Sequence, residues 1–352
     1  MPRTSFHRLT VAAVDRLCED AAAVTFAVPD DLAAEFAFRP GQSVTVRREV
    51  DGRDERRSYS ICAPAGAPPR IGVRVVSGGA VSGWLAQEVA PGAEVEVAPP
   101  TGSFTPDLAR PGHHMLLAAG SGITPMLSIA ASLLANEAIH VTLLYGNRRV
   151  DSVMFADEIA DLKDAYPTRL HLVHVLSREA QEVELFTGRL DAAKLRTLIP
   201  ATCPPKSVDH WWLCGPYGMV VDAIAVLTDL GVPRERIHQE LFYVEDVPPP
   251  QERHVEPPPG PGAAVTVILD GRATDLTLPY ETSVLDCAQQ IRPDLPFACK
   301  GGVCGTCRAR LIDGEVTMRR NFALEPAELD AGFVLTCQSY AVTDHLTVDY
   351  DA

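Results

Sequence analysis

Four cysteines near the end of the chain constrain its fold more than any other feature. The first three follow the pattern Cys299-x4-Cys304-x2-Cys307, and Cys337 lies far downstream. Three thiols at this spacing can bind a common inorganic centre only if one loop wraps tightly around it. The spacing therefore predicts a metal-binding loop in the C-terminal part of the chain.

Glycines inside this loop favour that interpretation. Gly301, Gly302 and Gly305 allow tight turns with positive φ and bring backbone N–H groups close to the sulfur atoms. The spacing is that of a plant-type [2Fe–2S] cluster, which would use the four cysteines as ligands. A structural zinc site and a set of buried free thiols are the alternatives. Zinc usually binds paired C-x2-C knuckles, and only one such pair is present.

The other cysteines have no partner at a diagnostic spacing, and we expect them to be buried small residues: Cys18, Cys62, Cys203 and Cys287. The N-terminus lacks the sustained apolar segment of a secretory signal, so a reducing cytoplasm is expected. The most apolar stretch, residues 115–134, contains two glycines and a proline. It therefore predicts a strand, a turn and a helix and not a membrane span.

The overall charge also excludes classes of partner. The formal net charge of −15 argues against nucleic acid, because phosphate binding needs clustered Lys and Arg. It argues equally against an anionic membrane surface. The acidic residues are spread along the chain, which is typical of a solubilising surface.

The composition divides the chain into four parts. Residues 246–262 contain seven prolines and almost no large apolar side chain, which predicts an extended linker. We expect a β-barrel over 1–109, an α/β domain over 110–245 and a small β-grasp domain over 263–352.

Short apolar or alternating runs bounded by turn residues predict the antiparallel barrel, and they lie at 22–28, 43–47, 57–61, 72–76 and 94–98. Apolar strands that alternate with helices predict a doubly wound parallel sheet, with strands at 115–119, 141–145, 170–176 and 211–214 and helices from Pro125, over 155–165 and over 219–230. The tail predicts a hairpin at 265–278, a helix at 283–291 and strands at 309–312, 334–337 and 346–349.

Three short motifs occur in the order Arg57-Ser58-Tyr59-Ser60, Gly120-Ser121-Gly122-Ile123-Thr124-Pro125 and Cys214-Gly215-Pro216. Each is weak alone. The second has the better context, because it joins a strand to a helix whose free N–H groups can bind a pyrophosphate. It departs from the G-x-G-x-x-G dinucleotide pattern, since Thr124 and Pro125 follow directly.

Together with the cluster motif, the chain resembles the ferredoxin–NADP reductase superfamily in its form fused to a ferredoxin. That resemblance implies that Arg57 pairs with the pyrophosphate of FAD, while Tyr59 and Ser60 lie against the isoalloxazine ring and ribityl chain. It also implies flavin phosphate contacts from a second segment, which includes Val81 and Ser82. The alternative for Tyr59 is a core aromatic on a barrel strand.

The same resemblance implies a nicotinamide site formed by Gly120, Gly122 and Thr124. Gly215 and Pro216 would shape the pocket where the nicotinamide approaches the flavin, with Cys214 beside the path of the hydride. Glu240 resembles the acidic residue that the family keeps near the flavin ring. A surface glutamate is the alternative for Glu240. Cys214, Glu240 and Tyr59 are thus the catalytic candidates.

The choice between NADPH and NADH depends on charge near the adenosine ribose. Asn147-Arg148-Arg149 follows one predicted strand and Ser177-Arg178 follows the next. Guanidinium groups and a hydroxyl favour a 2′-phosphate, whereas NAD favours a carboxylate at this place. We therefore expect NADPH. The alternative is that these arginines only pair with Asp151 or Glu179.

These parts predict a reductase that takes electrons from NADPH to FAD and then to the cluster. The C-terminal segment resembles reductase subunits of the phenylacetyl-CoA epoxidase, which implies a di-iron oxygenase as the partner. Reductases of Rieske-type oxygenases, such as the ketosteroid 9α-hydroxylase, share the cofactor motifs and remain an alternative. A redox sensor or electron carrier is the alternative from another class, although it would not need a nucleotide domain.

Overall fold

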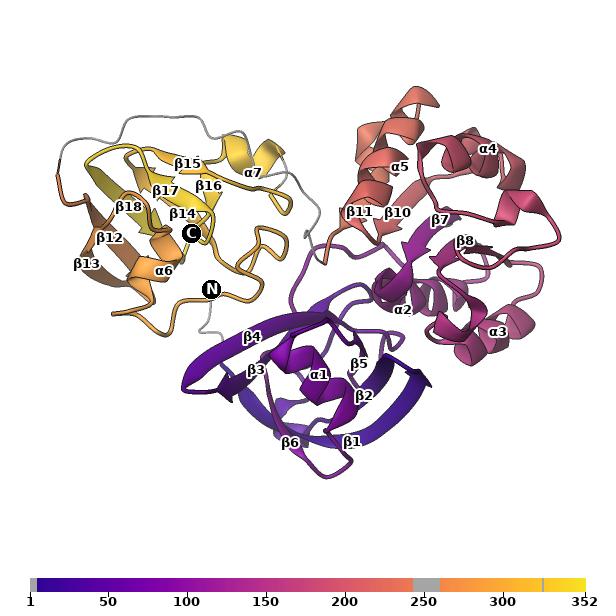
Figure 1. The fold of residues 1–352 in the computed structure, drawn as a ribbon, viewed down its shortest axis with the longest axis horizontal. Helices are drawn as coiled ribbons and strands as arrows, with labels where there is room; N and C mark the ends of the chain where they lie inside the picture. The colour runs from indigo at the N-terminus through magenta and orange to yellow at the C-terminus, as the bar shows by residue number, and fades with distance from the viewer. Residues whose placement is uncertain (1–4, 243–259, 325) are drawn as a thin grey trace. The chain divides into compact units, whose positions relative to one another are not determined.

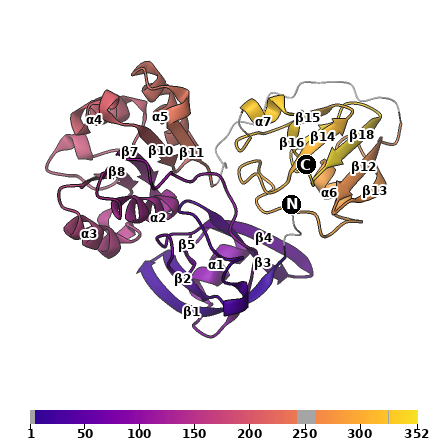
Figure 2. The same ribbon diagram turned by 180° about the vertical axis from the view of Figure 1, so that it is seen from behind.

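The computed structural model describes residues 5–242, 260–324 and 326–352 (Figures 1 and 2). One compact unit is Phe6–Phe242, and the described residues from Gly260 onward belong to a second. The predicted linker, 246–262, lies almost entirely outside the described residues. Among the described residues, none of the helices has the length and apolar character that crossing a membrane requires. The cytoplasmic location stays a prediction.

The first part of the larger unit is an antiparallel β-barrel, as predicted. Its strands are ordered β4-β3-β6-β1-β2-β5, and a bridge between Ile61 and Ile71 connects the two ends of this sheet. A short helix packs against β2 and β5 (Figure 1). The elements are β1 (His7–Cys18), β2 (Ala21–Ala27), β3 (Ser43–Val50), β4 (Arg53–Ser60), β5 (Arg70–Arg74), α1 (Ala80–Gln87) and β6 (Glu94–Val97).

Two barrel elements are absent from the sequence-based prediction. The longest strand, β1, was missed because irregularities at Val11/Ala13 and Arg16/Cys18 interrupt its alternation. Helix α1 is only eight residues long and contains Gly83, so its helical pattern is weak. The barrel core is formed by inward-facing side chains that include Leu9, Val24 and Phe26.

The second part of the larger unit is a parallel sheet with the order β11-β10-β7-β8-β9. The chain runs outward from β7 to β9 and then returns to β10 on the other side of β7. This reversal puts a crevice at the carboxyl ends of β7 and β10, the usual ligand site of such sheets. The elements are β7 (Gly112–Ala119), α2 (Ile123–Leu134), β8 (Ile139–Asn147), α3 (Ala156–Ala165), β9 (Leu170–Leu176), α4 (Ala192–Thr202), β10 (His210–Cys214), α5 (Tyr217–Asp229) and β11 (Ile237–Glu240).

The differences from the predicted elements have local causes. Helix α2 begins at Ile123, so Pro125 is its third residue and still lies in the first turn, where no N–H is needed. Helix α4 was missed because Pro200 reads as a helix breaker, although Asp191 caps its start by accepting from the Lys194 N–H. Strand β11 has only four residues, three of them polar.

The second unit contains a five-stranded sheet with the order β13-β12-β18-β14-β16, and β15 pairs with β17 beside it. The parallel pairing of β12 with β18 fits the predicted β-grasp fold. The elements are β12 (Ala263–Leu269), β13 (Arg272–Leu278), α6 (Val284–Ala288), β14 (Arg308–Asp313), β15 (Val316–Met318), α7 (Pro326–Asp330), β16 (Phe333–Leu335), β17 (Ser339–Ala341) and β18 (His345–Asp349). Helix α6 is shorter than predicted, and β16 ends before Cys337.

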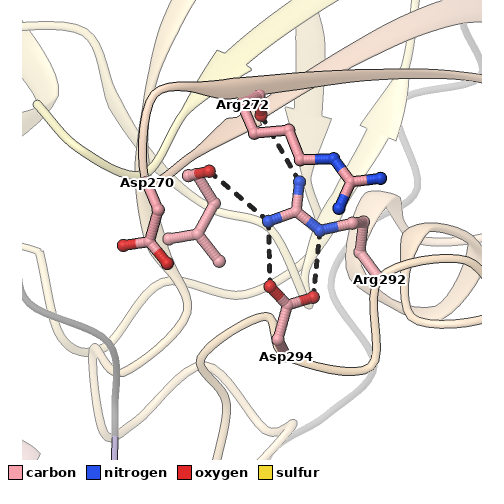
Figure 3. Close-up of a pocket in the computed structure, with 5 residues that line it drawn as sticks. Asp270, Arg272, Arg292 and Asp294 are labelled. Atoms are coloured by element: carbon pink, nitrogen blue, oxygen red, sulfur yellow. Dashed lines mark hydrogen bonds and ion pairs between the residues drawn. The ribbon is translucent and has the colours of Figure 1, made fainter.

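A buried arginine stabilises one end of this unit. Arg292 makes two 2.9 Å hydrogen bonds to the carboxylate of Asp294 (Figure 3). It makes another of 3.0 Å to Thr274 Oγ1. It also donates to the carbonyls of Leu269 and Arg272. The Arg292 guanidinium that lines the pocket in Figure 3 is therefore hydrogen-bonded to groups of the domain itself, and the role of Arg292 is structural.

Candidate functional site

The residues predicted to bind the flavin ring lie on β4. Arg57 and Tyr59 are opposite Val46 and Val44 of β3. The Arg57 side chain is half-exposed and pairs with Glu55 at 3.1 Å. Tyr59 is partly buried, and burial raises the pKa of its phenol, which stays neutral. Tyr59 packs against the barrel core and is only partly buried, which is compatible with the predicted place against a planar ring.

The second predicted flavin segment is the start of α1. Gly79 precedes the helix, and no side chain caps it. The Ser82 hydroxyl accepts from the Val76 N–H at 3.1 Å and donates to the Gly79 carbonyl at 3.3 Å, so it closes the turn. A Cβ on Gly79 would lie 2.6 Å from Ser82 Oγ. The free N–H groups around Val81 fit a pyrophosphate.

The glycine motif after β7 meets the motif after β10, as the sheet order requires. A Cβ on Gly122 would lie 2.1 Å from the Cys214 carbonyl oxygen, so only glycine permits this approach. Gly120 has a φ of +56°, and its carbonyl accepts from Tyr145 Oη at 3.0 Å. The Thr124 hydroxyl donates to the Ser121 carbonyl at 3.0 Å and holds the turn. This cradle fits the predicted nucleotide.

The turn after β10 is equally tight. A Cβ on Gly215 would lie 2.6 Å from Met219 Cε and 3.2 Å from Ala119. Pro216 then precedes the first residue of α5. The two motifs are thus in direct contact at the carboxyl ends of β7 and β10.

The three catalytic candidates are not equivalent. Cys214 is fully buried, and burial followed by the nearby Glu240 raises the pKa of its thiol well above the usual range. Glu240 lies beside Cys214 on the neighbouring strand and accepts a 3.0 Å hydrogen bond from Ser60 Oγ. Burial raises the pKa of Glu240 to about 7, against the effect of Ser60. Glu240 is therefore no ordinary surface glutamate, and it can exchange a proton near neutral pH.

The residues predicted to select NADPH lie at the ends of β8 and β9. The Arg178 N–H donates to the Arg148 carbonyl at 2.8 Å, so the two residues are neighbours. Ser177 is half-buried and Arg178 is exposed. Arg148 pairs with neither Asp151 nor Glu179, because its partner is Asp20 at 3.0 Å.

The two acids expected as local partners are bound to other groups. Arg149 pairs with Asp151 at 3.6 Å. Glu179 accepts from the Val150 N–H at 3.0 Å. The alternative of local pairing thus holds for Arg149 but not for Arg148.

The four predicted ligand cysteines lie in two pairs. The thiols of Cys299 and Cys304 lie close enough to shift each other's pKa, and so do those of Cys307 and Cys337. Among the described residues, no three His, Cys, Asp or Glu side chains converge as ligands of a single metal ion. Two thiol pairs fit a dinuclear iron cluster better than one tetrahedral zinc ion.

The backbone of the cluster loop matches the prediction in part. Gly302 and Gly305 have φ values of +80° and +67°, but Gly301 does not adopt a positive φ, and Lys300 has the value of +51° instead. The Gly301 N–H donates to Cys299 Sγ at 3.3 Å, as expected of a donor to cluster sulfur. A Cβ on Gly302 would lie 3.1 Å from the Arg320 carbonyl.

The remaining cysteines follow the prediction only in part. Cys62 and Cys287 are buried, but Cys18 and Cys203 are half-buried. Sequence reasoning missed Arg74, whose guanidinium lies against Gly120 and donates to the Ser152 carbonyl. No motif marks Arg74, since its position depends on the packing of β5 against the glycine turn.

Three known families match consecutive parts of the chain. Residues 8–105 match an oxidoreductase FAD-binding domain, 116–224 an oxidoreductase NAD-binding domain and 267–342 a 2Fe-2S iron-sulfur cluster binding domain. These matches confirm FAD, a nicotinamide nucleotide and a [2Fe–2S] cluster as the cofactors. The flavin and nucleotide domains favour the reductase over the sensor or carrier alternative, which would not need a nucleotide domain.

Full-length relatives share this arrangement. The chain is 42% identical to one of the subunits of the 1,2-phenylacetyl-CoA epoxidase of Escherichia coli K12, over 99% of both chains. It is 36% identical to the ferredoxin reductase component of a Rhodococcus rhodochrous 3-ketosteroid-9-alpha-monooxygenase, over 97% of this chain and 96% of that protein. The phthalate dioxygenase reductase structure has the same fold, with a TM-score of 0.59, 23% identity and 98% coverage of both chains. The chain therefore belongs to the family of oxygenase reductase components that join a ferredoxin–NADP reductase module to a C-terminal [2Fe–2S] ferredoxin domain.

Proposed function

We propose that this chain is the NADPH-dependent reductase component of a phenylacetyl-CoA epoxidase and acts in the cytoplasm. The proposal rests mainly on the contact of Glu240 with Ser60 and on its position beside Cys214. These neighbours bring the end of the predicted flavin strand to the carboxyl ends of β10 and β11. When bound there, the nicotinamide nucleotide and FAD supply hydride and single-electron chemistry. We also propose domain limits at 1–109, 110–245, 246–262 and 263–352.

For the flavin, we propose that Arg57 neutralises the pyrophosphate and that Tyr59 covers the ring. Val81 and Ser82 contribute backbone N–H groups at the start of α1, where the helix dipole favours an anion. Ser60 positions the Glu240 carboxyl, which holds or releases a proton near the ring. Cys214 is buried and its thiol is neutral, and we propose that it excludes water from the position beside Glu240.

For the nucleotide, we propose that Gly120, Gly122 and Thr124 bind its phosphates and that Gly215 and Pro216 shape the nicotinamide pocket. Arg148, Ser177 and Arg178 would bind a 2′-phosphate. The ratio of kcat/KM for NADPH to that for NADH tests this assignment. Arg178→Ala should lower the ratio about tenfold, because a charge-assisted bond contributes roughly 1.5–3 kcal/mol. An unchanged ratio would overturn the assignment.

For the cluster, we propose Cys299, Cys304, Cys307 and Cys337 as the ligands, two for each iron. The arrangement of the four thiols as two close pairs supports this proposal. The electrons would leave the protein from this domain toward the oxygenase.

The partner follows from the relatives. The greater identity to the epoxidase protein favours a di-iron epoxidase as the acceptor, with phenylacetyl-CoA as the final substrate. The second candidate is a Rieske-type ketosteroid hydroxylase, which the 36% identity over nearly the full length supports.

Reconstitution distinguishes the two candidates. The chain is combined with the other components of the Escherichia coli epoxidase and, separately, with the oxygenase component of the Rhodococcus system. Oxygen incorporation from labelled O2 is then measured with NADPH present. Incorporation into phenylacetyl-CoA alone is expected. Incorporation only into the ketosteroid would replace the proposed partner by the second candidate.

A further inference from the structure

One carboxylate of the barrel domain binds two arginines, and these come from different domains. Asp20 lies in the turn between β1 and β2. Its Oδ1 lies 3.2 Å from Arg74 Nε of the barrel, and its Oδ2 accepts from Arg148 Nη2 of the α/β domain at 3.0 Å. The Cys18 thiol also donates to Oδ1 at 3.2 Å. Asp20 thus occupies part of the Arg148 guanidinium.

The two acids that the sequence places close to Arg148 and Arg178 are bound to other groups. Asp151 pairs with Arg149, and Glu179 accepts from the Val150 N–H. Arg178 is exposed beside Arg148. Asp20 is therefore the carboxylate that directly offsets the charge of Arg148 in this structure.

Asp20 keeps its negative charge at neutral pH. Burial acts to raise its pKa, but Arg74, the Cys18 thiol and Arg148 outweigh burial, and the pKa lies below its usual value. The Asp20 carboxylate is in contact with the Arg148 guanidinium. A second anion that binds this guanidinium would lie close to the Asp20 charge, and the two negative charges repel each other even after screening by salt.

We propose that Asp20, a residue of the barrel domain, is a specificity-determining residue that limits how tightly Arg148 binds the 2′-phosphate of the nucleotide. This inference rests on the proposed role of Arg148. The ion pair of Asp20 with Arg148 connects the two domains, and it lowers the affinity of Arg148 for the phosphorylated ribose. It acts on the 2′-phosphate alone, so the affinity for the unphosphorylated adenosine moiety does not depend on it.

The test uses the purified full-length chain with its bound flavin and measures the binding of two nucleotide fragments by calorimetry. We expect Asp20→Asn, which keeps a hydrogen-bonding group for Arg74, to bind 2′,5′-ADP roughly fivefold more tightly. The affinity for 5′-AMP should stay the same. Asp151→Asn is the matched control, because it removes an acid that pairs with Arg149, and both affinities should change less than about twofold.

Two further variants separate the possible failures. Arg148→Ala should weaken 2′,5′-ADP binding, and the gain from Asp20→Asn should disappear in the double variant. If Arg148→Ala weakens binding but Asp20→Asn does not strengthen it, or strengthens both ligands equally, this inference is overturned and the role of Arg148 stands. If Arg148→Ala changes nothing, the proposed role of Arg148 fails as well. Asp20→Ser replaces Asp20→Asn if the latter does not fold.

Discussion

The hydroxyl of Ser60 donates a 3.0 Å hydrogen bond to the carboxylate of Glu240, although 180 residues separate them in the chain. Ser60 ends a strand of the barrel, and Glu240 ends the outermost strand of the parallel sheet. Cys214 lies beside Glu240 on the next strand. This contact brings the flavin motif and the nicotinamide motif to one place. Burial raises the pKa of Glu240 to about 7, although the Ser60 hydrogen bond acts to lower it.

Replacement of Glu240 should change how stability depends on pH. The pKa of Glu240 is raised above its value in the unfolded chain, so its contribution is favourable below about pH 4.5 and is lost as the pH rises through 7. Glu240→Gln removes this loss. We expect the thermal unfolding midpoint of Glu240→Gln to exceed that of the wild type by roughly 3 °C at pH 8 and by nothing at pH 4, below the unfolded pKa.

Ser60 provides the partner experiment. Its hydrogen bond favours the charged form of Glu240, so Ser60→Ala should move the loss of stability to higher pH. Ser58→Ala, on the same strand but bonded to Thr45, should leave the pH profile unchanged. Identical profiles for Ser60→Ala and Ser58→Ala would show that the Ser60 contact does not control the titration.

Gly72 sets how closely the barrel approaches the nucleotide domain. A Cβ on Gly72 would lie 2.5 Å from Thr124 Cγ2 and 2.8 Å from Phe155 Cζ. Phe155 is buried and has a φ of +59°, a strained value that the contacts around it must maintain. Gly72→Ala should destabilise the unit by about 1–3 kcal/mol and slow flavin reduction by saturating NADPH at least tenfold.

Denaturant unfolding and stopped-flow absorbance measure these two effects. The affinity for 2′,5′-ADP should stay within about twofold, because the phosphate-binding turns themselves are intact. Gly83→Ala is the control for stability, since nothing lies within 4 Å of its Cβ position and alanine favours a helix by about 1 kcal/mol. Equal stability for Gly72→Ala and the wild type would contradict the close approach.

A group of histidines should make the protein sensitive to acid. Trp212 stacks on His238 at 4.2 Å and donates to His114 at 3.2 Å, and His210 is 3.1 Å from His238. Burial lowers the pKa of His114 and of His238 to about 4. The neutral rings therefore stabilise the fold above about pH 6.5, and this stability is lost as the pH falls from 6.5 to 4.

Each of these two histidines should contribute about 2 kcal/mol to that loss, after allowance for partial exposure. His238→Phe keeps a ring over Trp212 but cannot be protonated, so its unfolding free energy should fall less steeply between pH 6.5 and 4. His140→Phe is the control, because His140 is exposed on the same sheet. Equal slopes for His238→Phe and the wild type would rule out this source of acid sensitivity.

The sequence contained enough to predict the architecture, because the motifs have spacings that only certain backbones can satisfy. Gly122 is an example: the loop after β10 lies so close that no side chain fits. The cluster loop is another, although Lys300 and not Gly301 takes the left-handed conformation. Such local backbone requirements can be recognised in the amino-acid sequence, because only certain residue types satisfy them.

Contacts between distant segments could not be predicted in the same way. The Ser60–Glu240 bond, the position of Arg74 against Gly120 and the pair formed by Asp20 and Arg148 all depend on how the barrel packs on the parallel sheet. No spacing in the chain encodes that packing. Strand β1 also escaped prediction, since its irregularities break the alternation that reveals a strand.

Electrons should pass from NADPH through the flavin module to a cluster held by the four cysteines. Anaerobic mixing with NADPH, followed at the absorbance bands of the flavin and of the cluster, tests this transfer most directly. Cys304→Ser is compared with Cys287→Ser, a buried cysteine of the same domain outside the loop. We predict that both bands bleach in the wild type and in Cys287→Ser, whereas Cys304→Ser lacks the cluster band but reduces its flavin at the normal rate. A cluster that stays oxidised in the wild type while the flavin is reduced, or a normal cluster in Cys304→Ser, would contradict the account.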